Sequence, residues 1–198
     1  MMEKHQLRKQ LLAARKAMAP EEKAWRDKAI AERLLAWLET NPAECIGVYW
    51  PTQGEPDLTA IYPMLAARGV ELALPVVVER NAPLMFYAWQ PRDVLVADHH
   101  GVMAPENRSV ALTPDLLVVP CVGFNAEGYR LGYGGGYYDR TLARQHAPRT
   151  VGVAYAMCKA VIAASEHDVK MNVLITETSD NAHQFLSQPF KDKAAPSE

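Results

Sequence analysis

The chain has 198 residues, 49% of them hydrophobic, which is enough material for one sizeable core. A formal net charge of −2 at pH 7 excludes a general electrostatic attraction to nucleic acid or to an anionic membrane. The first residues lack the apolar core of a signal peptide, and no apolar run approaches the roughly 20 residues of a membrane span. We therefore expect a cytoplasmic protein without a nucleic acid or membrane partner.

Helical and strand patterns alternate along the chain. Helices are predicted at residues 3–18 and about 20–39, the second with a proline in its first turn, and further helices at about 57–68 and from residue 137 to 147, with a short one near Val161. Strands separated by helices of this length imply an α/β fold with a mostly parallel sheet covered on both faces. The expected strands are "CIGVYW", "VELALPVVV", "LMFYAW", "PDLLVVP", "RTVGVAYA" and "NVLIT".

The rest of the chain divides simply. Residues 91–113 are predicted to be a long connection, residues 1–180 a single domain, and residues 181–198, which lose periodicity, a flexible tail. Three cysteines are far apart in apolar surroundings, so we expect buried free thiols rather than disulfides or a zinc site; they are Cys45, Cys121 and Cys158.

The segment "GYGGG", residues 132–136, places four glycines directly before a predicted helix. A glycine-rich turn between a strand and a helix lets backbone N–H groups approach an anion such as a phosphate. The segment matches neither of the two common nucleotide-binding fingerprints. The alternative is a turn whose glycines merely supply positive φ angles, and the pattern by itself does not decide between the two.

Three cations of the first helix lie on its apolar side. At about 100° per residue, Lys4, Arg8 and Arg15 fall within roughly 40° of one another, beside the leucines. Long basic side chains lying along apolar surface, with their heads in water, would explain this pattern. The functional interpretation is that the helix borders a cleft and directs these cations towards phosphates.

Three acidic residues lie at the ends of predicted elements: Asp139 follows the glycine segment, Asp168 lies just before the last strand, and Glu55 lies in the loop after the first strand. Asp139 and Asp168 could together supply the one or two carboxylates that Mg²⁺ needs beside a polyphosphate; the alternatives are a dipole-favoured helix acid and a turn residue. Glu55, with Trp50, could hold a flat heteroaromatic ligand. Spacing alone favours an exposed turn acid and a core tryptophan instead.

The motifs "GFNAEGYRLGYGGGYYDR", "YWPTQGEPD" and "EHDVKMNVLITE", with Lys4 and Arg8 ahead of them, resemble in order the 5-formyltetrahydrofolate cyclo-ligase (methenyltetrahydrofolate synthetase) family. The resemblance covers residues 3 to 177, and it departs from the usual pattern at Cys121, Asn125 and Trp50. It implies a three-layer α/β/α sandwich like that of ribose-phosphate isomerase and glucosamine-phosphate deaminase. It further implies ATP- and Mg²⁺-dependent cyclisation of 5-formyltetrahydrofolate, with no obligatory protein partner.

The resemblance also implies roles for individual residues. Lys4, Arg8 and Arg130 would hold the phosphates of ATP, and Asp139 and Asp168 would bind Mg²⁺. The folate would be held by Trp50, Glu55 and Tyr138, with no dedicated acid or base. Two other classes stay open: a sugar-phosphate isomerase or deaminase on the same fold, and a non-catalytic folate- or nucleotide-binding protein. The backbone cradle for the phosphates would consist of Gly132, Tyr133, Gly134, Gly135, Gly136 and Tyr137.

Overall fold

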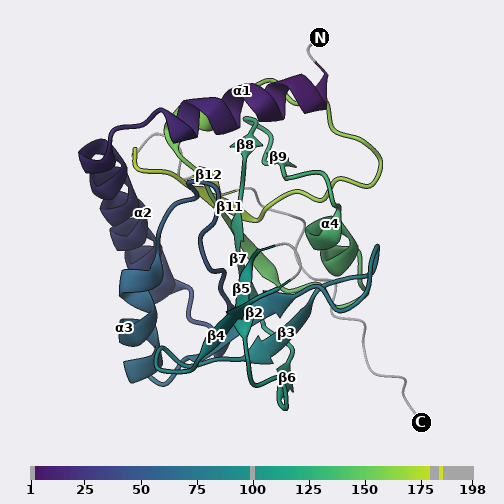
Figure 1. Ribbon diagram of the computed structural model, residues 1–198. Coiled ribbons are helices and arrows are strands. Elements are labelled where there is room, and N and C mark those ends of the chain that lie inside the picture. Colours follow the sequence, from purple (N-terminus) through teal and green to yellow (C-terminus); the bar gives the residue numbers. More distant parts are fainter. Residues whose placement is uncertain (1–2, 99–100, 179–182, 185–198) are drawn as a thin grey trace.

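A computed structural model describes residues 3–98, 101–178 and 183–184 (Figure 1). Its centre is an eight-stranded sheet in the order β12-β11-β10-β7-β1-β2-β3-β6, accompanied by two small two-stranded sheets, β4-β5 and β8-β9. The strands of the large sheet are β1 (Cys45–Gly47), β2 (Glu71–Val76), β3 (Met85–Ala88), β6 (Ala111–Leu112), β7 (Leu116–Pro120), β10 (Arg149–Val153), β11 (Val173–Ile175) and β12 (His183–Gln184).

The five central strands of the large sheet, β11-β10-β7-β1-β2, pair in parallel. Antiparallel strands flank this block, with β3 and β6 on one side and β12 on the other. The prediction of an α/β fold with a mostly parallel sheet is therefore confirmed. Strand β7 lies inside the parallel block and is the uninterrupted apolar run "LLVVP", as expected of a strand buried on both faces.

Helices cover both faces of the sheet (Figure 1). The helices α2 (Pro20–Thr40) and α3 (Tyr62–Ala67) pack on one face, and the short α4 (Tyr137–Leu142) packs on the other. Alternate residues of β7 enter the two resulting cores: Leu116 and Val118 face α2 and α3, whereas Leu117 and Val119 face α4. No helix in the described part of the chain is both long and apolar enough to cross a membrane.

The first helix, α1 (Lys4–Lys16), lies across one end of the sheet (Figure 1). Its Arg15 donates hydrogen bonds to the backbone oxygens of Gly54, in the turn after β1, and of Cys121, at the end of β7. Both partners follow the carboxyl ends of parallel strands, so α1 covers the edge of the sheet at which open α/β folds bind their ligands.

Three local predictions of secondary structure were wrong. The segment 91–113 is not an unstructured connection, because it contains the hairpin β4 (Leu95–Ala97) and β5 (Met103–Pro105) and the edge strand β6. The helix near Val161 is absent from the described residues; a single 3-10 turn, η2 (Ala156–Cys158), precedes that position. The helix expected at 137–147 ends at Leu142.

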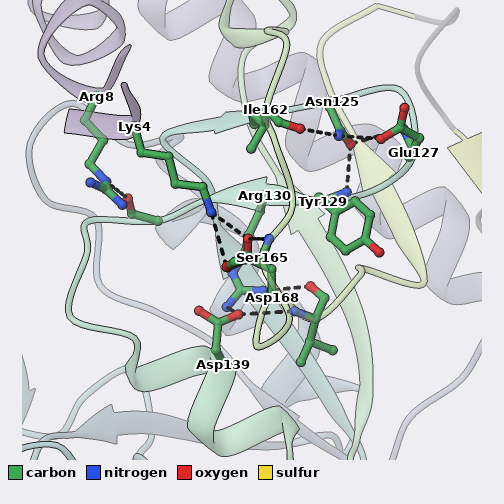
Figure 2. A network of polar contacts seen from close by, with 12 residues as sticks. Lys4, Arg8, Asn125, Glu127, Tyr129, Arg130, Asp139, Ile162, Ser165 and Asp168 are labelled. Carbon is green, nitrogen blue, oxygen red and sulfur yellow. Dashed lines mark hydrogen bonds and ion pairs between the residues drawn. The ribbon is translucent and has the colours of Figure 1, made fainter. Parts of the chain in front are cut away.

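The prediction of the element that precedes the glycine segment was also wrong. The segment was expected to join a strand of the main sheet directly to a helix, but it follows a separate hairpin of β8 (Gly123–Phe124) and β9 (Arg130–Leu131). This hairpin is organised by the buried Asn125, whose side-chain oxygen accepts the N–H groups of Glu127 and Tyr129 (Figure 2). The predicted tail, residues 181–198, lies outside the described residues except for β12.

Candidate active site

A cavity of about 930 Å³ opens beyond the carboxyl ends of the parallel strands. Tyr49 and Trp50, shortly after β1, and Pro120, at the end of β7, border it, as do α1, the glycine segment and the start of α4. Every residue to which the family resemblance assigns a ligand or a metal lines this one cavity, whereas Arg15, the third cation that the helix pattern directed towards phosphates, does not. The residues with such an assignment are Lys4, Arg8, Trp50, Glu55, Arg130, Gly132, Tyr133, Gly134, Gly135, Gly136, Tyr137, Tyr138, Asp139 and Asp168.

The cations of α1 point towards this cavity rather than away from the protein. Lys4 Nζ donates to Asp168 Oδ2 at 2.6 Å, and Arg8 Nε donates to the backbone oxygen of Gly132 at 2.7 Å (Figure 2). Arg15, in the last turn of α1, is only 2% exposed. For Arg15 both interpretations are wrong, because its guanidinium is neither in water nor part of the cavity lining; Lys4 and Arg8 border the cleft as predicted.

The two aspartates belong to one polar network (Figure 2). Asp139, in the first turn of α4, accepts a hydrogen bond from Arg130 Nη2 at 2.7 Å, and the N–H of Val169 lies 3.4 Å from the same oxygen. Val169 directly follows Asp168, which Lys4 holds. Burial opposes ionisation of Asp168, but hydrogen bonds from Lys4 and Ser165 outweigh it and lower the pKa of Asp168. Each carboxylate is thus paired with one cation of the cavity wall.

The glycines of the segment are not equivalent. Gly134 and Gly136 have φ angles of +100° and +66°, which residues with side chains rarely adopt. Gly132 does not have a positive φ, and a Cβ added to it would meet no atom within 4 Å. The conformation of the turn therefore explains Gly134 and Gly136, but it does not explain why position 132 lacks a side chain.

Glu55 is the buried acid of the cavity. It is 3% exposed, so the interpretation as an exposed turn acid is wrong. The N–H of Thr52 donates to Oε2 at 2.8 Å, and the hydroxyl of Tyr133 donates to Oε1 at 2.7 Å. Burial raises the pKa of Glu55, although these two hydrogen bonds and the charge of Arg15 act in the opposite direction.

Aromatic side chains form the wall near Glu55. Trp50 is half-buried and packs edge-on against Trp89, with ring centroids 5.9 Å apart. Tyr138 lies beneath the guanidinium of Arg130, whose Cζ is 6.0 Å from the ring centroid. The cavity therefore joins a region of cations and carboxylates to a region of aromatic rings around one buried acid.

Sequence reasoning missed part of the lining. Pro75 and Val77 at the end of β2 border the cavity, and the rule that ligands lie beyond the carboxyl ends of parallel strands could have identified them. His167 is exposed and also lines the cavity. All three cysteines are buried and free, as predicted.

Comparison with known proteins agrees with the motifs. The sequence profile of the 5-formyltetrahydrofolate cyclo-ligase family matches residues 1–177. A 5-formyltetrahydrofolate cyclo-ligase of Mycolicibacterium smegmatis is 32% identical over 187 residues, which cover 87% of this chain and 93% of that protein.

Two solved structures are similar over nearly their whole length. The 5,10-methenyltetrahydrofolate synthetase of Aquifex aeolicus is 29% identical with a TM-score of 0.79, covering 100% of this chain and 97% of the other. That of Mycoplasma pneumoniae is 30% identical with a TM-score of 0.70, covering 89% and 100% respectively. The chain belongs to the 5-formyltetrahydrofolate cyclo-ligase family.

Proposed function

We propose that this protein uses ATP to cyclise 5-formyltetrahydrofolate to 5,10-methenyltetrahydrofolate, with release of ADP and phosphate. The observation that carries the proposal is the common location of the predicted residues. The side chains predicted to bind phosphate, those predicted to bind Mg²⁺ and those predicted to bind the folate all line one cavity. At about 930 Å³ this cavity is at the upper end of the range of single-ligand pockets, which suits two substrates that must react with each other.

The cationic end of the cavity suits the phosphates of ATP. Lys4 and Arg8 reach it from α1, and Arg130 reaches it from β9. The glycine segment adds backbone N–H groups, and Gly132 leaves space where a side chain would stand. Arg8 currently donates to the backbone of that segment, so a phosphate in the same space would receive donors from both.

Asp139 and Asp168 suit a Mg²⁺ ion that is shared with a polyphosphate. The described residues contain no group of three or more His, Cys, Asp and Glu side chains that could hold a metal by themselves. Mg²⁺ usually takes only one or two carboxylates and completes its coordination with water and phosphate oxygens, so two aspartates are sufficient. When bound, the metal would neutralise charge on the phosphates.

Ion pairs inside the site favour a ligand that carries both charges. Lys4 pairs with Asp168, and Arg130 pairs with Asp139. Free phosphate would attract the cations but repel the carboxylates, and a free cation would do the reverse. A complex of Mg²⁺ with ATP supplies a new partner to both members of each pair. We therefore expect nucleotide and metal to bind together more tightly than either binds alone.

The aromatic end suits the pterin ring of the folate. The Glu55 carboxylate would accept ring N–H donors, Trp50 would line the pocket, and Tyr138 would contact the folate. In this arrangement the folate would lie beside the phosphates, as a direct transfer between them requires.

The chemistry divides into two steps. The formyl oxygen attacks the terminal phosphorus of ATP, and the bond to ADP breaks. N10 of the folate then attacks the activated formyl carbon, phosphate leaves with the former formyl oxygen, and N10 loses its proton. Phosphorylation converts a poor leaving group into a good one. The protein contributes position and charge neutralisation, which dominate phosphoryl transfer, so no dedicated general base is assigned.

The test is the ultraviolet absorbance of the methenyl product. Purified protein is mixed with 5-formyltetrahydrofolate, Mg²⁺ and ATP, and the control omits ATP. Growth of the methenyl chromophore only with ATP supports the proposal. A folded protein that binds both substrates without forming the chromophore would instead be a non-catalytic binding protein, and one that binds neither would return the question to sugar-phosphate chemistry.

A further inference from the structure

The side chain of Tyr133 does not face the phosphate end of the cavity, although its backbone belongs to the glycine segment. Its hydroxyl donates to Glu55 Oε1 at 2.7 Å, and it accepts a hydrogen bond from Arg15 Nη2 at 3.2 Å. Glu55, Tyr133 and Arg15 therefore form a continuous chain of hydrogen bonds. The chain joins three segments that are far apart in the sequence: the turn after β1, the glycine segment and α1.

Arg15 is fixed at the end of this chain. It is 2% exposed, and its other donors face the backbone oxygens of Gly54 at 3.2 Å and Cys121 at 3.5 Å. A buried guanidinium held by carbonyl groups keeps its charge in place without neutralising it. This charge polarises the Tyr133 hydroxyl, which strengthens the hydrogen bond that the hydroxyl donates to Glu55.

The surroundings of Glu55 make this support necessary. Burial raises the pKa of Glu55, which makes its carboxylate easier to protonate than that of an exposed glutamate. Only the ionised carboxylate accepts hydrogen bonds at both oxygens, as a pair of ring N–H donors requires. Arg15 is a cation that acts on Glu55, and the phenols of Tyr49, Tyr62, Tyr133 and Tyr138 and the thiol of Cys121 also lie around it.

We propose that Tyr133 and Arg15 are positioning residues that hold Glu55 ionised and correctly oriented for the pterin ring of the folate. This inference rests on the proposed function. The glycine segment then serves both halves of the cavity. The backbone of Gly132 accepts a hydrogen bond from Arg8 of α1, and the hydroxyl of Tyr133 donates to Glu55, the carboxylate proposed to bind the folate.

The test replaces the hydroxyl alone, in Tyr133→Phe, with Tyr129→Phe as the matched control. Tyr129 packs against Lys170 outside the cavity lining, so removal of its hydroxyl leaves Glu55 untouched. The first measurement is a carbon NMR titration of the Glu55 carboxyl, whose signal is assigned by its loss in Glu55→Gln. We expect the pKa of Glu55 to be higher in Tyr133→Phe than in wild type and unchanged in Tyr129→Phe.

The second measurement is the binding of 5-formyltetrahydrofolate as a function of pH. A hydrogen bond to a charged group is lost, so we expect affinity at pH 7 to fall about tenfold in Tyr133→Phe, with the acid limb of the binding curve moved to higher pH. Nucleotide affinity should be unchanged. Arg15→Lys retains the positive charge but not the several N–H donors of the guanidinium, so its folate affinity should lie between that of wild type and that of Arg15→Met.

The outcomes separate the inference from the proposed function. An unaltered Glu55 titration in a folded Tyr133→Phe variant overturns the inference, whatever the folate binding. A raised pKa of Glu55 together with the expected loss of folate affinity supports it. Wild-type protein that binds no folate at any pH refutes the proposed function, and with it the role of this chain in folate binding, even if the NMR titration confirms the coupling of Tyr133 to Glu55.

Discussion

Substitution of Gly132 by alanine should separate folding from ligand binding. The φ of Gly132 lies outside the left-handed region and an added Cβ meets no atom within 4 Å, so the folded chain can accept alanine without strain. Alanine also restricts the unfolded chain, which increases the free energy of unfolding by about 0.4–1 kcal/mol at a compatible position. The melting temperature of Gly132→Ala should therefore be equal to or slightly higher than that of wild type.

The same methyl group should weaken nucleotide binding. It would occupy the space that we assign to a phosphate, and loss of one hydrogen bond to a charged oxygen costs about 1.5–3 kcal/mol. At about 1.4 kcal/mol per factor of ten, this corresponds to a roughly 10- to 100-fold loss of affinity for ATP with Mg²⁺. Titration calorimetry with a non-hydrolysable ATP analogue measures this affinity, and thermal unfolding of the same samples measures stability.

Gly134→Ala is the comparison that makes the result interpretable. With its φ of +100°, Gly134 should lose stability on substitution by about 1–2 kcal/mol, and affinity should fall with it. If Gly132→Ala bound the analogue as tightly as wild type, the assignment of this space to a phosphate would be wrong. If Gly132→Ala were clearly destabilised, the reasoning from its backbone conformation would fail instead.

Three further predictions concern charge, packing and thiol chemistry. Lys4→Ala should lower kcat/KM at least tenfold while costing at most about 1 kcal/mol of unfolding free energy, and Lys28→Ala, which removes a more exposed ion pair, should leave activity unchanged. Gly47→Ala should reduce unfolding free energy by about 1–3 kcal/mol in denaturant titrations, because its Cβ would lie 2.9 Å from Phe86 Cε1 in the core. Burial raises the pKa of all three thiols, to about 11 for Cys45 and to about 12 for Cys121, with that of Cys158 also raised. The native protein should therefore react slowly with a thiol reagent at pH 8, whereas the unfolded protein should react at all three cysteines. The native state should also lose stability as the pH rises above the unfolded thiol pKa of about 8.5, because the unfolded chain then releases protons that the folded chain retains.

Periodicity predicted those parts of the site that depend on one element alone. The spacing of Lys4, Arg8 and Arg15 on a helix is fixed by helix geometry; Lys4 and Arg8 line the cavity, whereas Arg15 is buried and donates to the Tyr133 hydroxyl. Parallel strands were also predictable, since long apolar runs alternate with helices. Short strands were not: β4, β5, β6, β8 and β9 have two or three residues each, too few for an alternating pattern to be recognised.

The state of Glu55 could not be derived from its neighbours in the sequence. Its turn is polar and looks solvated, yet Tyr133, 78 residues later, covers it and donates to it. Lys4 and Asp168 are similarly 164 residues apart. Such contacts depend on how the chain returns to the same end of the sheet, which local spacing does not encode. Only the family's motifs, through resemblance, identified Glu55 in advance.

The order of the strands explains why these distant residues nevertheless meet. Strands β1 and β7 are parallel neighbours, so the Glu55 turn and the hairpin that leads into the glycine segment both leave the same edge of the sheet. The buried Arg15 of α1 donates to Gly54 and Cys121, and it thereby ties this helix to both exits. Arg15 therefore both anchors α1 to the sheet and donates to the Tyr133 hydroxyl, which in turn donates to Glu55. A change at Arg15 should accordingly affect the position of the α1 cations as well as the Glu55 carboxylate, whereas a change at Tyr133 should affect only Glu55.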